Sequence, residues 1–413
     1  MCRELKDSGI PWIGEIPKDW TIELIGNQIK EVNNPNTNGL EDNALQFKMG
    51  SIISKSRGDS KYNPETLEGY NIVDKGVIML NGLNLSFDLI SQRVGLVRER
   101  GVITSTYLAV KPSNNIDSEY LTYLFKAYDN CKAFHSMGRG LRQTLSYGEL
   151  RKYLLLYPSL DEQQRIAEFL DRKCAEVDEI IGLQEQIIEE LKAYKQSVIT
   201  EAVTKGLNPD VPMRDSGIEW IGQIPEHWEL CKLKRKYRLL NGRAYSDNEL
   251  LSEGKYRILR VGNLFTSNHW YYSDLELEDN KYCEKGDLLY GWSASIGPYM
   301  WEEEKVIYHY HIWKVLFAPN IRRYAYYQLQ ALTDAKKKDM HGTAMQHLTM
   351  DNMNNSYIAT APIIEQQAIA DYLDEKCADI DSLIQTKLSK IDSLKEYKKS
   401  IIYEYVTGKR EVE

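Results

Sequence analysis

EQQRIAEFLD at residues 162–171 returns as EQQAIADYLD at residues 365–374, so the same helix-like stretch occurs twice in the chain. A second stretch also recurs: DSGIPWIGEIPKDW at residues 7–20 returns as DSGIEWIGQIPEHW at residues 215–228. Two unrelated blocks that recur in the same order, about two hundred residues apart, indicate a duplicated unit. This period is too long for a solenoid repeat and matches a whole domain with its connector.

Composition is that of an ordinary globular protein. The chain has 413 residues, of which 42% are hydrophobic and 27% charged, and this length predicts two to three domains. No apolar run reaches the ~18 residues that a membrane span needs, and the first residues lack the apolar core of a secretory signal. The sequence therefore disfavours a secreted or membrane protein and predicts a cytoplasmic one.

The six cysteines are scattered and form no C-x-x-C pair. This pattern favours reduced thiols and disfavours a disulfide framework or a zinc site, so no metal or cofactor is expected. Cys174 and Cys377 occupy the same place in the two repeats, and we expect both to be small buried packing residues.

The net charge of −8 is unevenly distributed. Most of it falls in residues 162–206 and 365–413, so the remainder of the chain is close to neutral and can form basic patches. The two acidic segments themselves read as long helices. The first contains no proline and a single glycine between Glu162 and Thr204, and would extend roughly 65 Å at about 1.5 Å per residue.

Apolar residues recur by heptads in both helical segments, and we expect the two segments to pair with each other. The predicted pairing positions are Leu170, Val177, Gln184, Leu191 and Val198 in the first segment and Leu373, Ile380, Lys387, Leu394 and Ile401 in the second. An adjoining apolar row holds Ile166, Ile180, Ile187 and Tyr194, and Ile369, Leu383 and Tyr397. The middle position is polar in both copies, which would fix the pairing register; alternatively, both polar residues lie at the edge of a loose seam.

The segments at about 21–160 and 229–363 are predicted to be mixed α/β globules. Short runs rich in Val, Ile, Tyr and Trp, such as residues 76–80 and 286–290, are typical of half-buried strands. The two globules match only in outline, whereas the helices and the N-terminal motifs are near copies.

These motifs, in this order, closely resemble the specificity subunit of type I restriction–modification systems over the whole chain. The resemblance implies two mixed α/β target recognition domains separated by two long antiparallel helices that form a coiled coil, with pseudo-two-fold symmetry. It assigns residues 1–160 and 207–363 to the recognition domains and residues 161–206 and 364–413 to the helices.

The resemblance also implies a function without catalysis of its own. Each domain would read one half of a bipartite target in double-stranded DNA, and the helix pair would set the spacer. Two modification (methyltransferase) subunits would bind this subunit, and restriction translocase subunits would join through them.

Two alternatives remain open. Asp287, Glu303 and Lys305 match the metal-binding pattern of a DNA endonuclease, although residues 302–304 also suit a charged turn. A coiled-coil assembly scaffold without sequence reading is the other alternative. His309 and His311 would share one face of a strand, where packing is favoured over metal binding. Neither a complete methyltransferase cofactor loop nor a P-loop is present.

DNA binding requires cations for phosphates and amide, guanidinium or aromatic groups for base edges. Residues 231–246 hold six cations and no acid, and glycines accompany several Arg and Gln residues. The predicted contacts are Asn81, Asn84, Arg139, Arg142 and Gln143 in the first globule and Lys232, Lys234, Arg235, Arg243, Trp292, Ser293, Gln346 and His347 in the second. A solvated surface is the alternative for the cations, and framework hydrogen bonding for Gln143 and Gln346.

The repeated tryptophans suggest a structural role. Trp12 and Trp20 recur as Trp220 and Trp228 too faithfully for target-specific contacts. Their apolar character predicts docking of each globule onto the helices, and a surface facing the methyltransferase is the alternative.

Overall fold

The computed structural model describes residues 3–39, 41–48, 50–55, 67–85, 92–138, 143–318, 321–339 and 348–412. The chain divides into two compact units. Unit 1 contains residues 1–184 together with residues 388–413, and unit 2 contains residues 185–387. Each unit therefore holds one α/β globule and one half of each of the two long helices, α5 (Leu160–Lys205) and α9 (Ile363–Val406).

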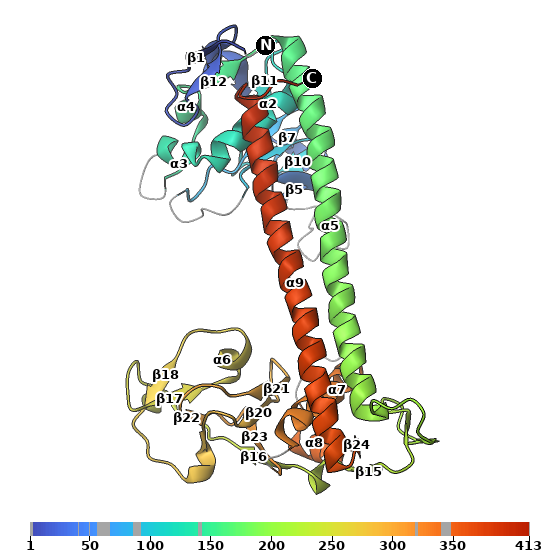
Figure 1. The fold of residues 1–413 in the computed structure, drawn as a ribbon. Helices are drawn as coiled ribbons and strands as arrows, with labels where there is room; N and C mark the ends of the chain where they lie inside the picture. The colour runs from blue at the N-terminus through green and yellow to red at the C-terminus, as the bar shows by residue number, and fades with distance from the viewer. Residues whose placement is uncertain are drawn as a thin grey trace. The chain divides into compact units, whose positions relative to one another are not determined.

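Unit 1 is built from short strands and helices (Figure 1). Its elements before α5 are β1 (Leu5–Asp7), β2 (Glu15–Pro17), β3 (Thr21–Leu24), α1 (Ile25–Gln28), β4 (Ile29–Glu31), η1 (Thr37–Gly39), β5 (Leu45–Lys48), β6 (Ser51–Ser54), β7 (Asn71–Val73), β8 (Ile78–Leu80), β9 (Val94–Leu96), β10 (Gly101–Ile103), β11 (Leu108–Pro112), α2 (Ser118–Asn130), α3 (Ala133–Met137), α4 (Tyr147–Leu150) and β12 (Leu154–Tyr157).

Unit 2 follows the same plan with other lengths. Its elements before α9 are β13 (Met213–Asp215), β14 (Gln223–Pro225), β15 (Glu229–Lys232), η3 (Leu233–Arg235), β16 (Arg238–Asn241), η4 (Asp247–Glu249), β17 (Tyr256–Leu259), α6 (Val261–Phe265), β18 (Tyr271–Ser273), η5 (Asp279–Lys281), β19 (Tyr282–Cys283), β20 (Leu288–Gly291), β21 (Gly297–Met300), β22 (Val306–Tyr308), β23 (Ile312–Leu316), α7 (Arg322–Asp339), α8 (Met350–Asn355) and β24 (Tyr357–Thr360).

The central sheets of the two units have the same topology. Unit 1 orders its four strands β4-β11-β8-β9, and unit 2 orders the equivalent strands β16-β23-β20-β21, all antiparallel. Their strands are rich in buried Val, Ile, Leu and Tyr, which suits a sheet that packs against helices. The predicted fold class, a mixed α/β domain that occurs twice, is thus confirmed.

Small capping groups set the ends of the helices. At the start of α4 the Ser146 hydroxyl accepts a hydrogen bond from the Glu149 amide at 3.4 Å, and Thr349 does the same for α8 at 3.2 Å. The long helices end where Gly206 and Gly408 adopt positive φ angles of 78° and 69°.

Within each unit, α5 and α9 pack antiparallel. In unit 1 the Phe169 ring lies 4.3 Å from that of Tyr405, and the Lys398 Nζ lies 2.6 Å from an Asp178 carboxylate oxygen, so residue numbers rise along α5 as they fall along α9 (Figure 1). In unit 2 the Lys195 Nζ meets Asp381 at 2.7 Å. These two ion pairs join equivalent positions of the repeat, as an antiparallel pair of duplicated helices requires.

The predicted pairing positions differ in burial. Six of the ten are buried and four are half-buried, and Val198 is half-buried although it packs against the core cluster of unit 2. The buried positions are Leu170, Val177, Gln184, Leu373, Ile380 and Ile401, and the half-buried ones are Leu191, Val198, Lys387 and Leu394. The Gln184 Oε1 atom accepts no hydrogen bond from the described residues. Four members of the adjoining row are exposed rather than paired: Ile180, Tyr194, Leu383 and Tyr397.

The repeated N-terminal motif docks on the helices, as predicted. Trp20 is buried in one cluster with Ile166 of α5 and Ile402 of α9, and Trp228 is buried with Val203 and Ile369 in unit 2. The remaining motif tryptophans, Trp12 and Trp220, are half-buried. Cys174 and Cys377 are buried in the same two clusters, and this burial raises the pKa of both thiols.

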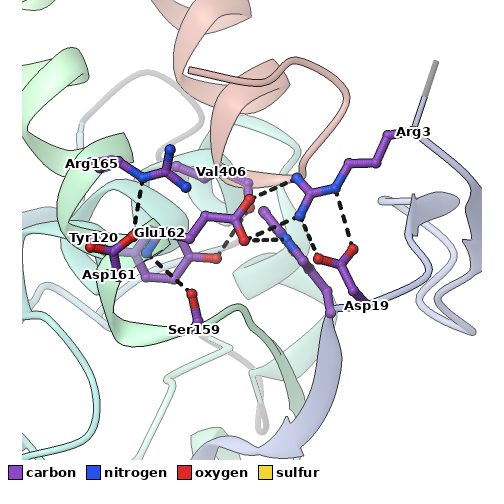
Figure 2. A network of polar contacts seen from close by, with 9 residues as sticks. Arg3, Asp19, Tyr120, Ser159, Asp161, Glu162, Arg165 and Val406 are labelled. Atoms are coloured by element: carbon purple, nitrogen blue, oxygen red, sulfur yellow. Dashed lines mark hydrogen bonds and ion pairs between the residues drawn. The ribbon is translucent and has the colours of Figure 1, made fainter. Parts of the chain in front are cut away.

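A glutamate at the start of each long helix fixes this docking. In unit 1 the Trp20 Nε1 donates to Glu162 Oε2 at 3.0 Å, and the Arg3 Nη1 donates to Glu162 Oε1 at 2.7 Å. Figure 2 shows the Arg3 guanidinium between the carboxylates of Glu162 and Asp19. In unit 2 the Trp228 Nε1 donates to the equivalent glutamate, Glu365, at 2.9 Å.

Removal of the Glu162 carboxylate is expected to destabilise unit 1. Glu162→Ala leaves the buried indole N–H of Trp20 without its acceptor and removes one of the two carboxylates that the Arg3 guanidinium contacts, which costs about 2–3 kcal/mol. Thermal unfolding of the full chain measures the effect. Asp161→Ala, which removes an exposed carboxylate that pairs with Arg165, is the control and should cost less than about 0.5 kcal/mol. Equal melting temperatures for the two variants would contradict this role of Glu162.

Among the residues that the structure describes, no helix combines the length and the apolar character that crossing a bilayer requires.

Candidate nucleic-acid interface

In unit 1, two loops that carry predicted contact residues are joined by their backbones. One follows β8 and holds Asn81 and Asn84, and the other precedes α4 and holds Gln143. The Leu145 amide donates to the Gly82 carbonyl at 2.8 Å, and the Leu85 amide donates to the Gln143 carbonyl at 3.2 Å. Asn84 is exposed, Asn81 and Gln143 are half-buried, and all three lie at one end of the central sheet.

Glycine permits this close approach. A Cβ atom on Gly82 would lie 2.5 Å from the Leu145 carbonyl oxygen, and one on Gly138 would lie 2.8 Å from a Leu85 methyl carbon. Asn84 and Gln143 both adopt positive φ angles, of 51° and 43°, which few residues other than glycine and asparagine take readily. The local backbone is therefore arranged for the contact between the loops rather than for regular structure.

A buried arginine supports the loop that follows β8 from inside the fold. Arg93 is 1% exposed, and its Nη1 donates to the carbonyls of Asn81 and Leu83 at 2.9 and 2.8 Å. Its backbone amide donates to Asp129 at the end of α2 at 2.9 Å. Burial raises the pKa of the Asp129 carboxyl group. Sequence reasoning missed Arg93 because a single arginine gives no sign that it is buried.

Arg93→Ala is expected to destabilise unit 1 by about 3 kcal/mol, since two carbonyls lose a charged donor within the fold. The loop should also lose order, which amide hydrogen exchange over residues 81–85 measures. Arg98→Ala is the matched control, because Arg98 is more than half exposed and pairs with Glu119 at the surface. If both variants unfold at the same temperature, Arg93 does not support the loop.

Unit 2 joins the equivalent loops. The Leu348 amide, just before α8, donates to the carbonyl of Trp292, just after β20, at 3.1 Å. Trp292 is half-buried, whereas Ser293 is buried, so its hydroxyl has little room to reach a ligand. The two loops again meet at the end of the sheet where β20 ends. We call this end of each central sheet, with the loops that meet there, the loop edge. The two units carry unlike residues at this shared position.

Arg243 also lies at the loop edge of unit 2, but its guanidinium is engaged. Its Nη2 lies 2.7 Å from Glu249 Oε1, and its guanidinium carbon lies 5.2 Å from the centre of the Tyr245 ring. Hydrogen bonds from Arg243 and from Ser246 lower the pKa of Glu249 to about 2, so the pair is charged at neutral pH.

The other cations of the basic run lie at the far end of β16 from Arg243. Lys232 and Lys234 place their ammonium groups 3.4 and 3.1 Å from the Asn355 side-chain oxygen, and Arg235 is exposed. The structure therefore separates this run into two groups, of which only Arg243 shares the loop edge with Trp292. Arg139, Arg142, Gln346 and His347 lie outside the described residues.

Three lysines at the end of α7 add positive charge near the loop edge of unit 2. The hydroxyls of Thr333 in α7 and Tyr290 in β20 lie 2.7 Å apart, which brings the last turns of the helix beside the end of that strand. Lys336, Lys337 and Lys338 follow in the last turn of α7, and the latter two are exposed. This lysine run is visible in the sequence, but its position beside β20 is not.

The residues of the endonuclease pattern each contact a different partner. Asp287 pairs with Lys314 at 2.6 Å, and Glu303 pairs with Arg257 at 2.8 Å. Lys305 lies over the Tyr282 ring at 4.3 Å. His309 and His311 pack with their rings 4.8 Å apart, and no group of three or more metal-ligating side chains occurs among the described residues. Neither these contacts nor the relatives described below favour the endonuclease alternative.

The helices carry a second kind of surface. In unit 1 Ile180 and Tyr397 are exposed, and in unit 2 their repeat equivalents Leu383 and Tyr194 are exposed. The register set by the ion pair of Asp178 with Lys398 puts each exposed aliphatic residue at nearly the same level as a tyrosine of the other helix. Each unit therefore exposes one aliphatic residue and one tyrosine at this level of its helix pair, and we call these two residues the helix patch.

Taken together, the fold and its loop edges define a duplicated recognition protein, with two like frameworks that carry unlike loops. A family model described as the type I restriction modification DNA specificity domain matches residues 97–193 and 225–393. These matches take in more than half of the chain, and the protein belongs to this family.

Individual relatives agree. The chain is 24% identical to the type I restriction enzyme MjaVIII specificity subunit of Methanocaldococcus jannaschii, over 95% of this chain and 93% of that one. A structure described under complex assembly of a type I restriction–modification system has a TM-score of 0.70 at 13% identity, covering 96% and 99% of the two chains. The HsdS subunit of Thermoanaerobacter tengcongensis has a TM-score of 0.50 at 15% identity, covering 96% and 98%. This chain shares the fold of both structures.

Proposed function

We propose that each loop edge reads one half of a bipartite DNA target, with residues 1–160 and 207–363 as the two target recognition domains. The observation that carries this proposal is the repeat itself. The sheets, helix caps and docking motifs recur, whereas the loop edge holds Asn81, Asn84 and Gln143 in one unit and Trp292 with Arg243 in the other. Equivalent frameworks with different hydrogen-bonding groups suit two different half-sites.

Phosphate contacts would come from cations around these edges. Lys336, Lys337 and Lys338 are the candidates for this role in unit 2, whereas Arg139 and Arg142 are candidates for base contacts in unit 1. Gln346 and His347 remain candidates for base contacts, while Lys232, Lys234 and Arg235 would meet more distant phosphates or a partner protein. Arg142→Ala should weaken one half-site, whereas an equal loss on every sequence would make Arg142 a phosphate contact.

Catalysis would come from partner subunits in the cytoplasm. We infer that two modification subunits bind this chain and that restriction subunits join through them. Two matched helix patches support a count of two, because each patch offers an aliphatic residue and a tyrosine to solvent. Exposed apolar side chains that recur in both copies are suited to a protein interface.

Charge placed in a helix patch should block one modification subunit. Tyr397→Lys is expected to leave one copy bound instead of two, and Tyr397→Lys with Tyr194→Lys to leave none. The mass of the co-expressed complex measures this count. Tyr357→Lys is the control, since Tyr357 is exposed on β24 and lies outside the patches. Retention of two copies by the double variant would show that the modification subunits bind elsewhere.

Selection from a random duplex library tests the function itself. The full chain with its co-expressed modification subunits should enrich a two-part motif, with affinity that falls steeply as salt rises. An assembly scaffold without sequence reading, the alternative that the relatives do not favour, would enrich no motif.

A further inference from the structure

Hydrogen bonds to backbone carbonyl groups hold the turn between β22 and β23 at the loop edge of unit 2. This turn consists of His309, Tyr310 and His311. The Trp292 amide donates to the His311 carbonyl at 3.1 Å, and the Trp292 Nε1 donates to the Tyr310 carbonyl at 2.8 Å. On its other side, the Tyr310 amide donates to the Arg243 carbonyl at 3.0 Å. The turn is thus fixed between two segments in which we predicted DNA contacts.

The approach of the Arg243 segment depends on a glycine. A Cβ atom on Gly242 would lie 2.3 and 2.4 Å from the carbonyl oxygens of Tyr308 and His309, which is closer than any side chain tolerates. The ion pair of Arg243 with Glu249 then fixes the segment from outside. We therefore assign Arg243 to positioning the turn.

A row of aromatic rings connects the turn to the interior of unit 2. It starts at buried Tyr290, whose ring centre lies 5.7 Å from that of Trp313, and continues to Trp292 at 5.9 Å. The Trp292 ring lies 4.9 Å from His311, and His311 lies 4.0 Å from Tyr310. Such packing restricts side-chain rotation, so the end of the row is presented in a fixed orientation.

His309 and Tyr310, whose rings lie 4.5 Å apart at the end of this row, are uncharged donors and acceptors. Burial, with His311 and Arg260 nearby, lowers the pKa of His309 to about 4, so this imidazole is neutral at pH 7. Tyr310 is exposed, and its hydroxyl makes no hydrogen bond within the described part of the chain. A phenol hydroxyl both donates and accepts, which matches the edges of bases better than phosphate oxygens, where a cation is preferred.

Unit 1 carries a different turn at the equivalent place. Between β10 and β11 it has Thr104, Ser105, Thr106 and Tyr107, of which Ser105 and Thr106 are exposed. The two exposed side chains are also uncharged hydrogen-bonding groups, but they are small and lack rings, whereas the half-buried Tyr107 ring packs against Phe47. The position is therefore constant between the units while its chemistry differs, as expected of an element that distinguishes two half-sites.

We propose that the β22–β23 turn contacts base edges of the half-site bound by unit 2, with the Tyr310 hydroxyl as a specificity-determining group. The β10–β11 turn has the equivalent role in unit 1. This inference rests on the proposed function and names base-reading elements that the sequence motifs do not identify.

Tyr310→Phe tests the proposal, because it removes the hydroxyl and keeps the ring. It also keeps the hydrogen bonds of the Tyr310 backbone amide to Arg243 and of the Tyr310 carbonyl to Trp292. Methylated adenines are mapped in a host that expresses the full chain with its modification subunits. We expect the variant to relax base preference about tenfold at one or two positions of one half-site and to leave the other half-site unchanged. Tyr310→Ala should give a larger relaxation at the same positions. Tyr357→Phe, which changes an equally exposed tyrosine on β24, is the control and should give the wild-type map.

The outcomes separate this proposal from the function on which it rests. A wild-type map for both Tyr310 variants would overturn the role of the turn, as would an equal loss of methylation at every sequence. If wild-type protein itself yields no two-part motif, the proposed function fails instead. Melting temperatures of the variants within about 2 °C of wild type exclude misfolding as the cause of any change, since one exposed side chain contributes little to stability.

Discussion

Exchange of residues 229–363 for the corresponding segment of a relative is expected to change one half of the methylated target completely and leave the other half intact. The reason is that unit 2 keeps its own sheet, caps and hydrophobic clusters within this segment, apart from those that pack on α5 and α9. Its docking cluster combines Trp228 and Val203, which are retained, with residues such as Tyr324 of α7, for which the relative's segment must supply an equivalent.

The expected effect is large, because a half-site of several base pairs is replaced and each mismatched pair costs about 1–3 kcal/mol. Mapping methylated adenines before and after the exchange measures it. The control is the reciprocal exchange of residues 21–160, which should change only the other half. A change in both halves after either exchange would refute independent reading by the two units.

The second prediction concerns the spacer. Insertion of one heptad after Gln184 and one after Lys387 is expected to lengthen the spacer by about three base pairs, since seven helical residues add about 10 Å. The two insertion points coincide with the boundaries between unit 1 and unit 2 along α5 and α9, so neither unit loses its own helix packing. The half-sites themselves should not change.

A heptad inserted in α5 alone is the control for this experiment. It shifts one apolar stripe against the other, so the ion pairs of Asp178 with Lys398 and of Lys195 with Asp381 cannot both form with the heptad packing intact. We expect this variant to melt at a lower temperature and to methylate poorly. An unchanged spacer in the double insertion would mean that the helices do not determine the distance between half-sites.

The sequence allowed the repeat, the two long helices and the mixed α/β class to be predicted, because each leaves a local signal. Heptad spacing identifies Leu170 and Leu373 as core residues, and the glycines at 206 and 408 indicate the helix ends. The repeated tryptophans could be assigned to docking for a similar reason, since a motif that recurs unchanged points to a shared structural role.

The loop edge could not be assembled from sequence. The contact of Gly82 with Leu145 joins residues more than sixty positions apart, and no local pattern predicts it. Arg93 resembles any surface arginine, whereas Ser293 looks accessible and is buried. The adjoining helix row was expected to support the pairing seam, but Tyr194 and Tyr397 face solvent, because an antiparallel pair covers only one stripe of each helix.

Methylated-adenine mapping in a host genome, with and without this gene, tests the central claim most directly. Two unlike half-sites separated by a fixed number of unspecified bases should be modified only when the gene is present. A continuous motif, or the same modification pattern in its absence, would contradict a chain whose two units read two separate halves of one target.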